Sequence, residues 1–219
     1  IVAVDKKRRR GINKLIEHGV NLIILDDAFQ HRKVIPTYSL LLSDYSNLYF
    51  NDYLLPRGSL RESKKGSKRA DSIVITKCPE NFSQSDKNYL INRVKLSSNQ
   101  HIFFSKIKYS EELHSSSDTL NIKKLSNKKV NVVTGIVNSE VLISFLEDKN
   151  ITVEHFKYPD HFDYKEKDIL KFRDNITITT EKDYSKLRKF NIENLYYLPI
   201  SVDISDEKIF IETIRDRII

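Results

Sequence analysis

Residues 22–32, LIILDDAFQHR, give the clearest indication of the fold. Four apolar residues in a row are typical of a strand that is buried on both faces, as in the parallel sheets of α/β proteins. Asp26 and Asp27 follow directly, at the carboxyl edge where open α/β sheets bind ligands. A strand before a solvated acidic turn would give the same pattern. A turn without a function rarely also collects Gln30, His31 and a guanidinium, so the stretch favours a ligand-binding edge.

Apolar runs on both sides extend this pattern. Residues 1–4 and 38–42 are expected strands, and the helical spacing of apolar residues within 12–20 predicts a helix between the first two strands. A strand, a helix and a strand in this order form a parallel crossover unit. Residues 70–77 predict another strand, which ends in a Thr-Lys pair. We therefore expect the first third of the chain to form a mainly parallel sheet.

A second module is expected in the rest of the chain, where Gly becomes rare and Asn, Ser and Lys become frequent. Helices alternate there with strands, which predicts a smaller α/β domain. The expected helices are 89–96 and 140–146, and the expected strands are 101–104, 107–109, 130–136, 152–156, 176–183 with a charged end, and 195–200. We predict a core domain at 1–78, a connecting segment at 79–118 with a polar linker at 115–118, and the smaller domain at 119–219.

Composition limits the class of protein. Of the 219 residues, 31% are charged and 39% are hydrophobic, which indicates a globular chain and not a disordered one. The single Cys78 excludes a disulfide framework and fits a reducing compartment. No apolar run approaches the roughly 18 residues of a membrane span. The sequence begins inside a strand-like pattern, which we expect of a fragment of a longer protein.

The positive charge is concentrated at the start of the chain. Residues 1–77 contain 15 Lys and Arg against 8 Asp and Glu, whereas residues 78–219 contain 22 of each. Such an excess predicts an anionic partner: nucleotide phosphates, a phosphorylated substrate, an acidic membrane surface or nucleic acid. Solubility alone would explain it equally well. Much of the excess lies in what we call the basic cluster: Arg57, Arg61, Lys64, Lys65, Lys68 and Arg69.

Several short motifs follow one another along the chain: LDDAFQHR (25–32), LPRGSLRE (55–62), RAD (69–71), VITK (74–77), TGI (134–136), PDH (159–161) and TTEKD (179–183). Together and in this order, they resemble the tetraacyldisaccharide 4′-kinase family, the lipid A 4′-kinases. The resemblance extends over residues 1 to about 190. The Asp-Asp-x-Phe-Gln-His-Arg block is its most distinctive part.

The resemblance implies a P-loop kinase fold and a defined reaction. The family transfers the γ-phosphate of ATP, with Mg²⁺, to the 4′-hydroxyl of a tetraacylated glucosamine disaccharide 1-phosphate, and the product is lipid IVA. It also implies a monomer in peripheral contact with the cytoplasmic face of the bacterial inner membrane. No nucleic-acid partner is expected.

The resemblance also assigns roles to residues. Asp26 and Asp27 would be the Walker B acids that hold Mg²⁺. His161 would support the catalytic carboxylate, and Asp160 could orient its imidazole by a hydrogen bond. For TTEKD we favour a structural role, with Thr180 as a helix N-cap. The expected catalytic residues are Asp27, His31 and His161, the substrate-binding residues are Gln30, Arg57, Arg61 and Glu62, and the nucleotide-binding residues are Thr76 and Lys77.

Two features keep other interpretations open. The family's Gly-rich Walker A loop and its Asp-Glu pair are missing, and the chain has no Gly-Lys-Ser/Thr sequence. We expect both to lie before Ile1, so the chain alone should be inactive.

A basic nucleic-acid-binding module is one alternative, although the aromatic residues do not alternate with the cations. Another P-loop enzyme, a GTPase or a small-molecule kinase, is the other. Against a GTPase, Pro79 stands where a guanine-reading Asp would be.

Overall fold

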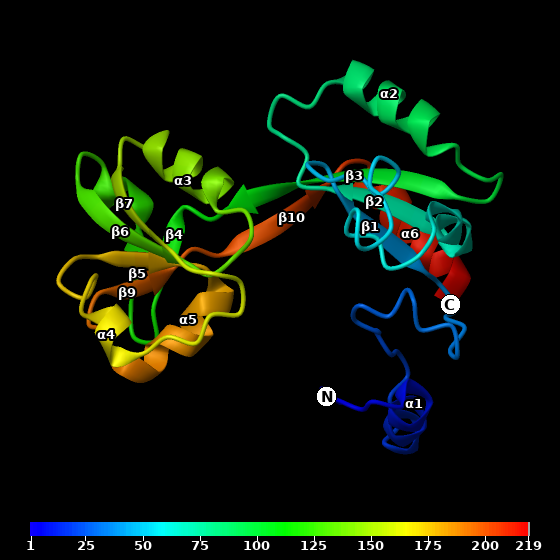
Figure 1. Ribbon diagram of the computed structural model, residues 1–219, viewed down its shortest axis with the longest axis horizontal. Helices are drawn as coiled ribbons and strands as arrows, with labels where there is room; N and C mark the ends of the chain where they lie inside the picture. Colours follow the sequence, from blue (N-terminus) through cyan, green and yellow to red (C-terminus); the bar gives the residue numbers. More distant parts are fainter. Residues whose placement is uncertain (219) are drawn as a thin grey trace. The chain divides into compact units, whose positions relative to one another are not determined.

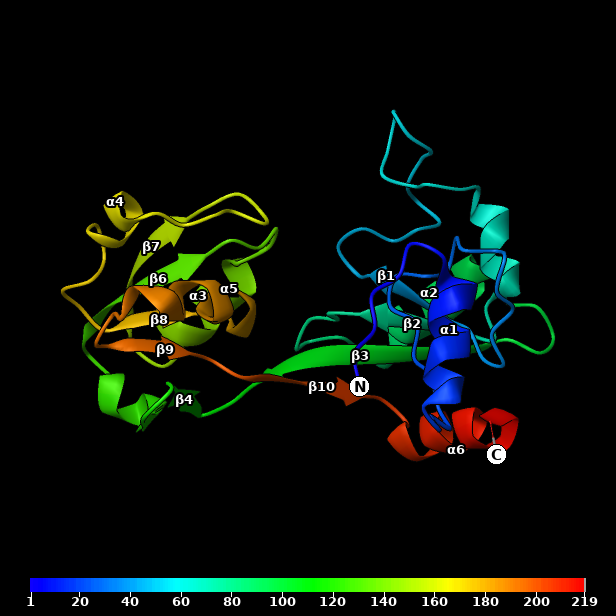
Figure 2. The same ribbon diagram turned by 90° about the horizontal axis from the view of Figure 1, so that it is seen from below.

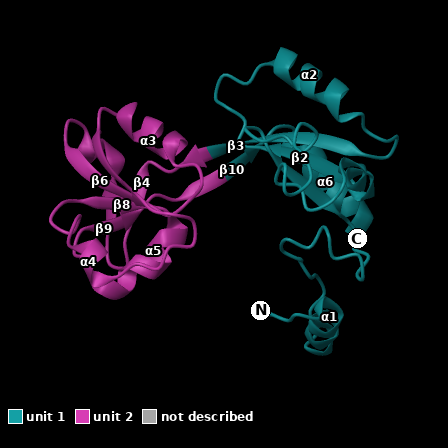
Figure 3. Cartoon of the chain, viewed as in Figure 1, with its two compact units in different colours: residues 1–107, 202–219 teal, residues 108–201 magenta. Residues whose placement is uncertain are grey.

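The computed structural model describes residues 1–218, which fall into two compact units. The first unit holds residues 1–107 and the segment that begins at Val202, and the second holds Lys108–Ser201 (Figures 1 and 3). The chain therefore passes from one unit to the other twice. Each unit has its own sheet and its own hydrophobic core.

The first unit contains a sheet with the strand order β1-β2-β3-β10. β1, β2 and β3 are parallel, as expected for strands joined by crossover connections. The central strand β2 has the apolar sequence SIVIT, and its first four residues are buried. The elements of this unit are α1 (Arg8–Glu17), β1 (Leu40–Asp44), the 3₁₀ helix η1 (Lys64–Arg69), β2 (Ser72–Thr76), α2 (Gln84–Val94), β3 (His101–Tyr109), β10 (Ile200–Ile204) and α6 (Glu207–Ile218).

Helices α2 and α6 cover opposite faces of this sheet (Figures 1 and 2). Successive residues of a strand point to opposite faces, so Phe103 and Phe104 of β3 contact different helices. Phe104 belongs to the same buried cluster as Leu90 of α2. The ring of Phe103 lies edge-on to Phe210 of α6, with 4.9 Å between the ring centroids.

The second unit contains a six-stranded sheet with the order β5-β4-β9-β8-β6-β7. β9, β8, β6 and β7 are parallel, whereas β4 and β5 form an antiparallel hairpin. Its elements are β4 (Glu112–His114), β5 (Thr119–Asn121), the 3₁₀ helix η2 (Ile122–Leu125), β6 (Lys129–Thr134), α3 (Glu140–Glu147), β7 (Thr152–Lys157), α4 (Glu166–Ile169), β8 (Thr177–Thr179), α5 (Glu181–Leu187), the 3₁₀ helix η3 (Arg188–Phe190) and β9 (Leu195–Tyr197).

The core of the second unit lies on both faces of its sheet. Val130 and Val132 of β6 belong to the cluster that includes Leu142 and Leu146 of α3. Val133 points to the other face and belongs to the cluster formed with α4 and α5. Because β6, β7 and β8 are parallel neighbours, the loops that follow them all start at one edge of the sheet.

The predicted fold class is confirmed: both units are α/β, and their sheets are mainly parallel. Two expected strands do not form, however. Residues 1–4 and 22–25 are irregular, and Val2 and Ile24 are 95% and 86% exposed. A strand requires a neighbour for its backbone N–H and C=O groups. Within residues 1–218, neither segment pairs with another strand.

The division of the chain differs from the predicted one in two respects. Residues 79–107 do not connect two domains, because α2 and β3 are part of the first unit, to which the chain returns at Val202. The expected linker at 115–118 is the tight turn between β4 and β5, where the amide of Ser115 donates to the carbonyl of Asp118 (2.9 Å).

In the described part of the chain, no helix has the length and apolar character that a membrane crossing requires.

Candidate functional site

The loop at 26–32 and the segment at 57–69 meet in the first unit. Nη1 of Arg61 lies 3.1 Å from Oδ2 of Asp27. The two carboxylate oxygens of Glu62 accept hydrogen bonds from Arg32 (2.8 Å) and Arg69 (2.7 Å). We call the residues that make these contacts, together with Phe29, which contacts Arg69, the arginine–carboxylate cluster: Asp27, Phe29, Arg32, Arg61, Glu62 and Arg69. Two motifs that are 30 or more positions apart in the sequence therefore form one surface.

Glu62 is the centre of this cluster. The hydrogen bond from Arg69 is the largest influence on its pKa, and together with the bond from Arg32 it outweighs burial and holds that pKa below the usual value. Arg69 also donates to the carbonyl of Phe29 (3.2 Å), and its guanidinium lies 4.7 Å from the centre of the Phe29 ring. Gly66 leaves room for the carboxylate, because an added Cβ would lie 2.7 Å from Oε2 of Glu62. Glu62 thus holds Arg32, which lies in the loop at 26–32, and Arg69, which contacts Phe29 of that loop.

Asp26 and Asp27 lie in an exposed turn, and Asp27 has a φ of 45°, in the left-handed region. Asp tolerates this conformation better than most residues. Within residues 1–218, no group of three or more His, Cys, Asp or Glu could hold a metal ion. Mg²⁺ commonly binds one or two carboxylates and takes its other ligands from phosphate oxygens and water. The adjacent carboxylates fit a Mg²⁺ ion of that kind.

Gln30 and His31 lie in the loop at 26–32, whereas Arg57 lies in a different setting. Gln30 is exposed and His31 is half-buried, in a turn closed by the bond from the His31 amide to the Ala28 carbonyl (2.8 Å). The guanidinium of Arg57 lies 4.1 Å from the centre of the Tyr53 ring. The structure gives no contact between Arg57 and the arginine–carboxylate cluster, so only Arg61 of the two expected substrate arginines belongs to it.

Thr76 and Lys77 lie at the carboxyl edge of the first sheet. Nζ of Lys77 is 2.6 Å from Oδ2 of Asp44, at the end of the neighbouring strand β1. Burial opposes ionisation of Asp44, but the hydrogen bonds from Lys77 and Ser46 outweigh it and hold the pKa of this carboxyl below its usual value. The expected nucleotide residues therefore occupy the edge where α/β sheets bind ligands.

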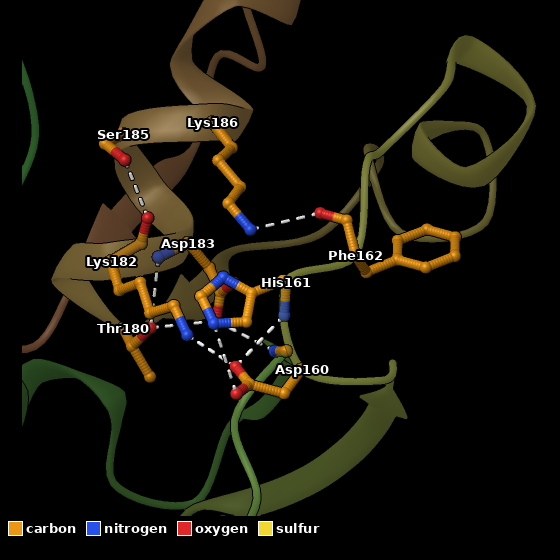
Figure 4. Close-up of polar contacts among 9 residues, drawn as sticks. Asp160, His161, Phe162, Thr180, Lys182, Asp183, Ser185 and Lys186 are labelled. Carbon is orange, nitrogen blue, oxygen red and sulfur yellow. Dashed lines mark hydrogen bonds and ion pairs between the residues drawn. The ribbon is translucent and has the colours of Figure 1, made fainter. Parts of the chain in front are cut away.

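His161 lies in the second unit, in the loop that follows β7. Its φ is 60° and its side chain is 81% exposed. Asp160 accepts the His161 amide (3.0 Å) at Oδ1, and its Oδ2 lies 3.5 Å from Nε2 of the imidazole. Lys182 of α5 donates to the same Oδ1 (2.5 Å), and Figure 4 shows Lys182 and His161 both directed toward Asp160. The hydrogen bond from Lys182 is the largest influence that lowers the pKa of Asp160.

Asp183 is the residue of this region that the sequence analysis missed in part. Thr180 caps α5 as predicted, since its hydroxyl accepts the Asp183 amide (3.1 Å). The carboxylate of Asp183 is also fully buried, and its Oδ2 accepts the Gly135 amide and the Thr180 hydroxyl, both at 2.8 Å. Burial, followed by the charge of Asp183, raises the pKa of Tyr164. The capping motif TTEKD signals the cap but not the bond to Gly135.

The other members missed are Arg32 and Arg69. The motifs assign no role to Arg32 and place Arg69 only in the basic cluster, because the shared partner Glu62 is distant from Arg32 in the sequence. Among the expected site residues, the structure brings Asp27, Arg61 and Glu62 together. His161 belongs to the second unit.

Comparison with known proteins gives the family. A family model described as tetraacyldisaccharide-1-P 4′-kinase (LpxK) matches residues 1–219. The tetraacyldisaccharide 4′-kinase of Flavobacterium psychrophilum is 38% identical over 219 residues, covering 95% of this chain and 63% of that protein. The corresponding protein of Bacteroides thetaiotaomicron is 32% identical over 231 residues, covering 93% of this chain and 61% of that protein.

A solved structure is similar as well. LpxK from Aquifex aeolicus in complex with ATP matches with a TM-score of 0.69 and 25% identity, over 97% of this chain and 62% of that one. The chain thus spans about three fifths of the length of these relatives. With a family model that matches its whole length, the chain belongs to the tetraacyldisaccharide-1-P 4′-kinase family.

Proposed function

We propose that this chain forms the greater part of an ATP-dependent kinase that phosphorylates the 4′-hydroxyl of tetraacyldisaccharide 1-phosphate to give lipid IVA. The observation that carries the proposal is the arginine–carboxylate cluster, in a chain of this family. Phosphoryl transfer depends mainly on positioning and on neutralising charge. Acids for a metal ion beside arginines for phosphate oxygens meet both requirements.

ATP and Mg²⁺ are the proposed cofactors. Asp26 and Asp27 would hold Mg²⁺, which when bound neutralises charge on the phosphates. Thr76 and Lys77 would contact the nucleotide at the edge of the first sheet. Lys77 is anchored by Asp44 at 2.6 Å, so its side chain is held at that edge.

Arginines are the proposed ligands of the anionic substrate. Arg61 offers a planar guanidinium that suits bidentate phosphate contacts. Its present partner is a single exposed carboxylate oxygen of Asp27, so other N–H groups remain available to a substrate. Gln30, Arg57 and Glu62 complete the proposed substrate set. We propose His31 and His161 as catalytic residues, with His161 supporting the catalytic carboxylate as the resemblance implies.

The proposed location is the cytoplasmic face of the bacterial inner membrane, where the protein would act as a peripheral monomer. Lys64, Lys65 and Lys68 support surface attachment, since all three are exposed and lie in one short segment. Each Lys or Arg near an anionic surface contributes about 1 kcal/mol of binding. No nucleic acid is proposed as a partner.

The test uses a chimeric kinase, defined as this chain joined to the part of the Flavobacterium psychrophilum kinase that it does not match. With radiolabelled ATP and tetraacyldisaccharide 1-phosphate, we expect labelled lipid IVA. The chain by itself should give none, because it has no Gly-Lys-Ser/Thr sequence to hold the phosphates. A chimera that folds and binds ATP but does not phosphorylate the disaccharide would contradict the proposal.

A further inference from the structure

The first turn of α5 contacts two separate loops at the carboxyl edge of the second sheet. Asp183 bonds to Gly135 in the loop after β6, and Lys182 bonds to Asp160 in the loop after β7. The two side chains are adjacent in sequence, so a single turn of helix holds both loops. Thr180 caps the same turn and bonds to the Asp183 carboxylate, which fixes the direction in which that turn starts.

The link from Asp183 to the loop after β6 is buried. Its carboxylate has no solvent exposure, and among residues 1–218 neither its Oδ1 nor the nearby hydroxyl of Tyr164 has a hydrogen-bond partner. An added Cβ at Gly135 would lie 2.9 Å from Oδ1 of Asp183 and 3.1 Å from the Tyr164 hydroxyl. The loop after β6 therefore fits closely around Asp183, and α5 is fixed against it.

The link from Lys182 acts on His161. The backbone of His161 has a φ of 60°, a left-handed conformation that costs free energy in a residue with a Cβ. Its amide donates to Oδ1 of Asp160, the atom that Lys182 also contacts. An exposed ion pair contributes little to stability. The pair of Lys182 and Asp160 instead fixes the carboxylate that accepts the hydrogen bond from the His161 amide. Its effect is therefore on the position of His161 and not on overall stability.

We propose that Lys182 and Asp183 are positioning residues for His161. Asp183 fixes α5 against the loop after β6, and Lys182 then holds Asp160 so that the His161 backbone and imidazole keep one orientation. The inference rests on the proposed function, since it takes His161 to serve phosphoryl transfer. Neither Lys182 nor Asp183 needs to touch the substrate or the nucleotide.

Lys182→Met, Lys182→Arg and the control Lys189→Met test the link to Asp160. Lys189 pairs with Asp163 of the same loop at 3.8 Å. It is a suitable control because the His161 amide bonds to Asp160 and not to Asp163. In the 219-residue chain, NMR should show faster hydrogen exchange of the His161 amide in Lys182→Met. Exchange should stay at the wild-type rate in Lys189→Met and return toward it in Lys182→Arg. Unchanged exchange in Lys182→Met would overturn the proposal, whatever the activity of the chimera.

Activity supplies the second measurement. In the chimeric kinase, Lys182→Met should lower kcat by about 10-fold to 100-fold, the effect of a small misplacement of a catalytic group, with KM for ATP unchanged. Because Lys182 acts through Asp160, adding Lys182→Met to Asp160→Asn should cost no further activity. Asp183→Asn keeps an acceptor for the Gly135 amide and should fold, whereas Asp183→Ala should loosen both loops.

These measurements distinguish the positioning role of Lys182 from the proposed kinase function. Faster exchange of the His161 amide in an inactive but folded chimera would support the positioning role and contradict the proposed function. Full activity of Lys182→Met in a chimera that phosphorylates the disaccharide would leave the proposed function intact and overturn the positioning role. Equal effects of Lys182→Met and Lys189→Met would also overturn it, because any surface ion pair would then act in the same way.

Discussion

Asp27 and Arg61 are 34 positions apart in the sequence, yet Nη1 of Arg61 lies 3.1 Å from Oδ2 of Asp27. Both side chains are exposed, at 71% for Asp27 and 64% for Arg61, so the pair adds little to stability. Its importance is positional, because it joins the loop at 26–32 to the basic cluster. An exposed carboxylate such as Asp27 can exchange a guanidinium for a metal cation. The guanidinium of Arg61 can then bind a phosphate.

The acidic turn gives the first prediction. In the chimeric kinase, Asp26→Asn and Asp27→Asn should each lower kcat by at least about 100-fold, because the charge stabilisation supplied by a metal ion amounts to several kcal/mol. Initial rates at several Mg²⁺ concentrations would measure the effect. Asp163→Asn is the matched control, since Asp163 is an exposed acid of the second unit (86% of its side chain). Near-normal turnover in both acidic-turn variants would remove the metal assignment.

Glu62 gives a prediction about pH. Its pKa is lowered in the folded chain by Arg69 and Arg32, so the ionised form is favoured by folding. The stabilisation is therefore fully present above the ordinary glutamate pKa of about 4.5 and is lost as the pH falls through the lower, folded value. Thermal unfolding between neutral and acidic pH should show a steeper loss of stability for the wild type than for Glu62→Gln. Parallel curves would show that the two arginines do not hold Glu62 in solution.

The sequence predicts an element well where its own residues supply what the element needs. The strand β2 is an apolar run with a parallel neighbour on each side, and it lies within the predicted strand at 70–77. The helix α2 is predicted only in part, because it begins at Gln84 and not at 89, after a capping box in which Ser83 and Asp86 bond to each other's backbone amides. The run at 22–25 (LIIL) is also apolar but has no neighbouring strand in the described part of the chain. Apolar composition alone therefore could not decide between a strand and an irregular segment.

The site shows the same distinction. Asp160 is adjacent to His161, so its possible contact with the imidazole could be predicted from the sequence. Lys182 reaches Asp160 from 22 positions away, because α5 and the loop after β7 start at the same edge of a sheet. The same reason applies to Asp183 with Gly135, and both contacts depend on strand order, which the motifs do not contain. Glu62 contacts Arg32 from 30 positions away, and that contact is also absent from the motifs.

Gly135 gives a prediction about packing. Gly135→Ala should destabilise the second unit by about 1–3 kcal/mol, the usual cost of overpacking a tight interior, because the new Cβ would lie 2.9 Å from the buried Asp183 carboxylate. Gly11→Ala is the matched control: Gly11 lies within α1, and its added Cβ would meet only the Asp5 side chain, at 3.3 Å. Alanine favours a helix interior over glycine. Urea unfolding of both variants would measure the difference, and equal midpoints would contradict the packing around Asp183.

The basic cluster gives a prediction that separates two kinds of cation. Lys64, Lys65 and Lys68 are exposed and should act as exchangeable surface charges. Replacing all three with Gln should weaken binding of the chain to anionic vesicles, and the loss should shrink at high salt, because screening already weakens such attraction. Activity of the chimeric kinase in detergent, where no charged surface is present, should stay near the wild-type value.

Arg61 should behave differently, because its proposed contact with the substrate is directed. Lysine keeps the charge but lacks the planar fork that binds a phosphate through two parallel hydrogen bonds. Arg61→Lys should therefore raise KM for the disaccharide or lower kcat even in detergent, by about 10-fold if one charge-assisted bond of roughly 1.5 kcal/mol is lost. If Arg61→Lys were instead harmful on vesicles and silent in detergent, like the lysine replacements, Arg61 would be part of a membrane-binding surface and would have no direct role with the substrate.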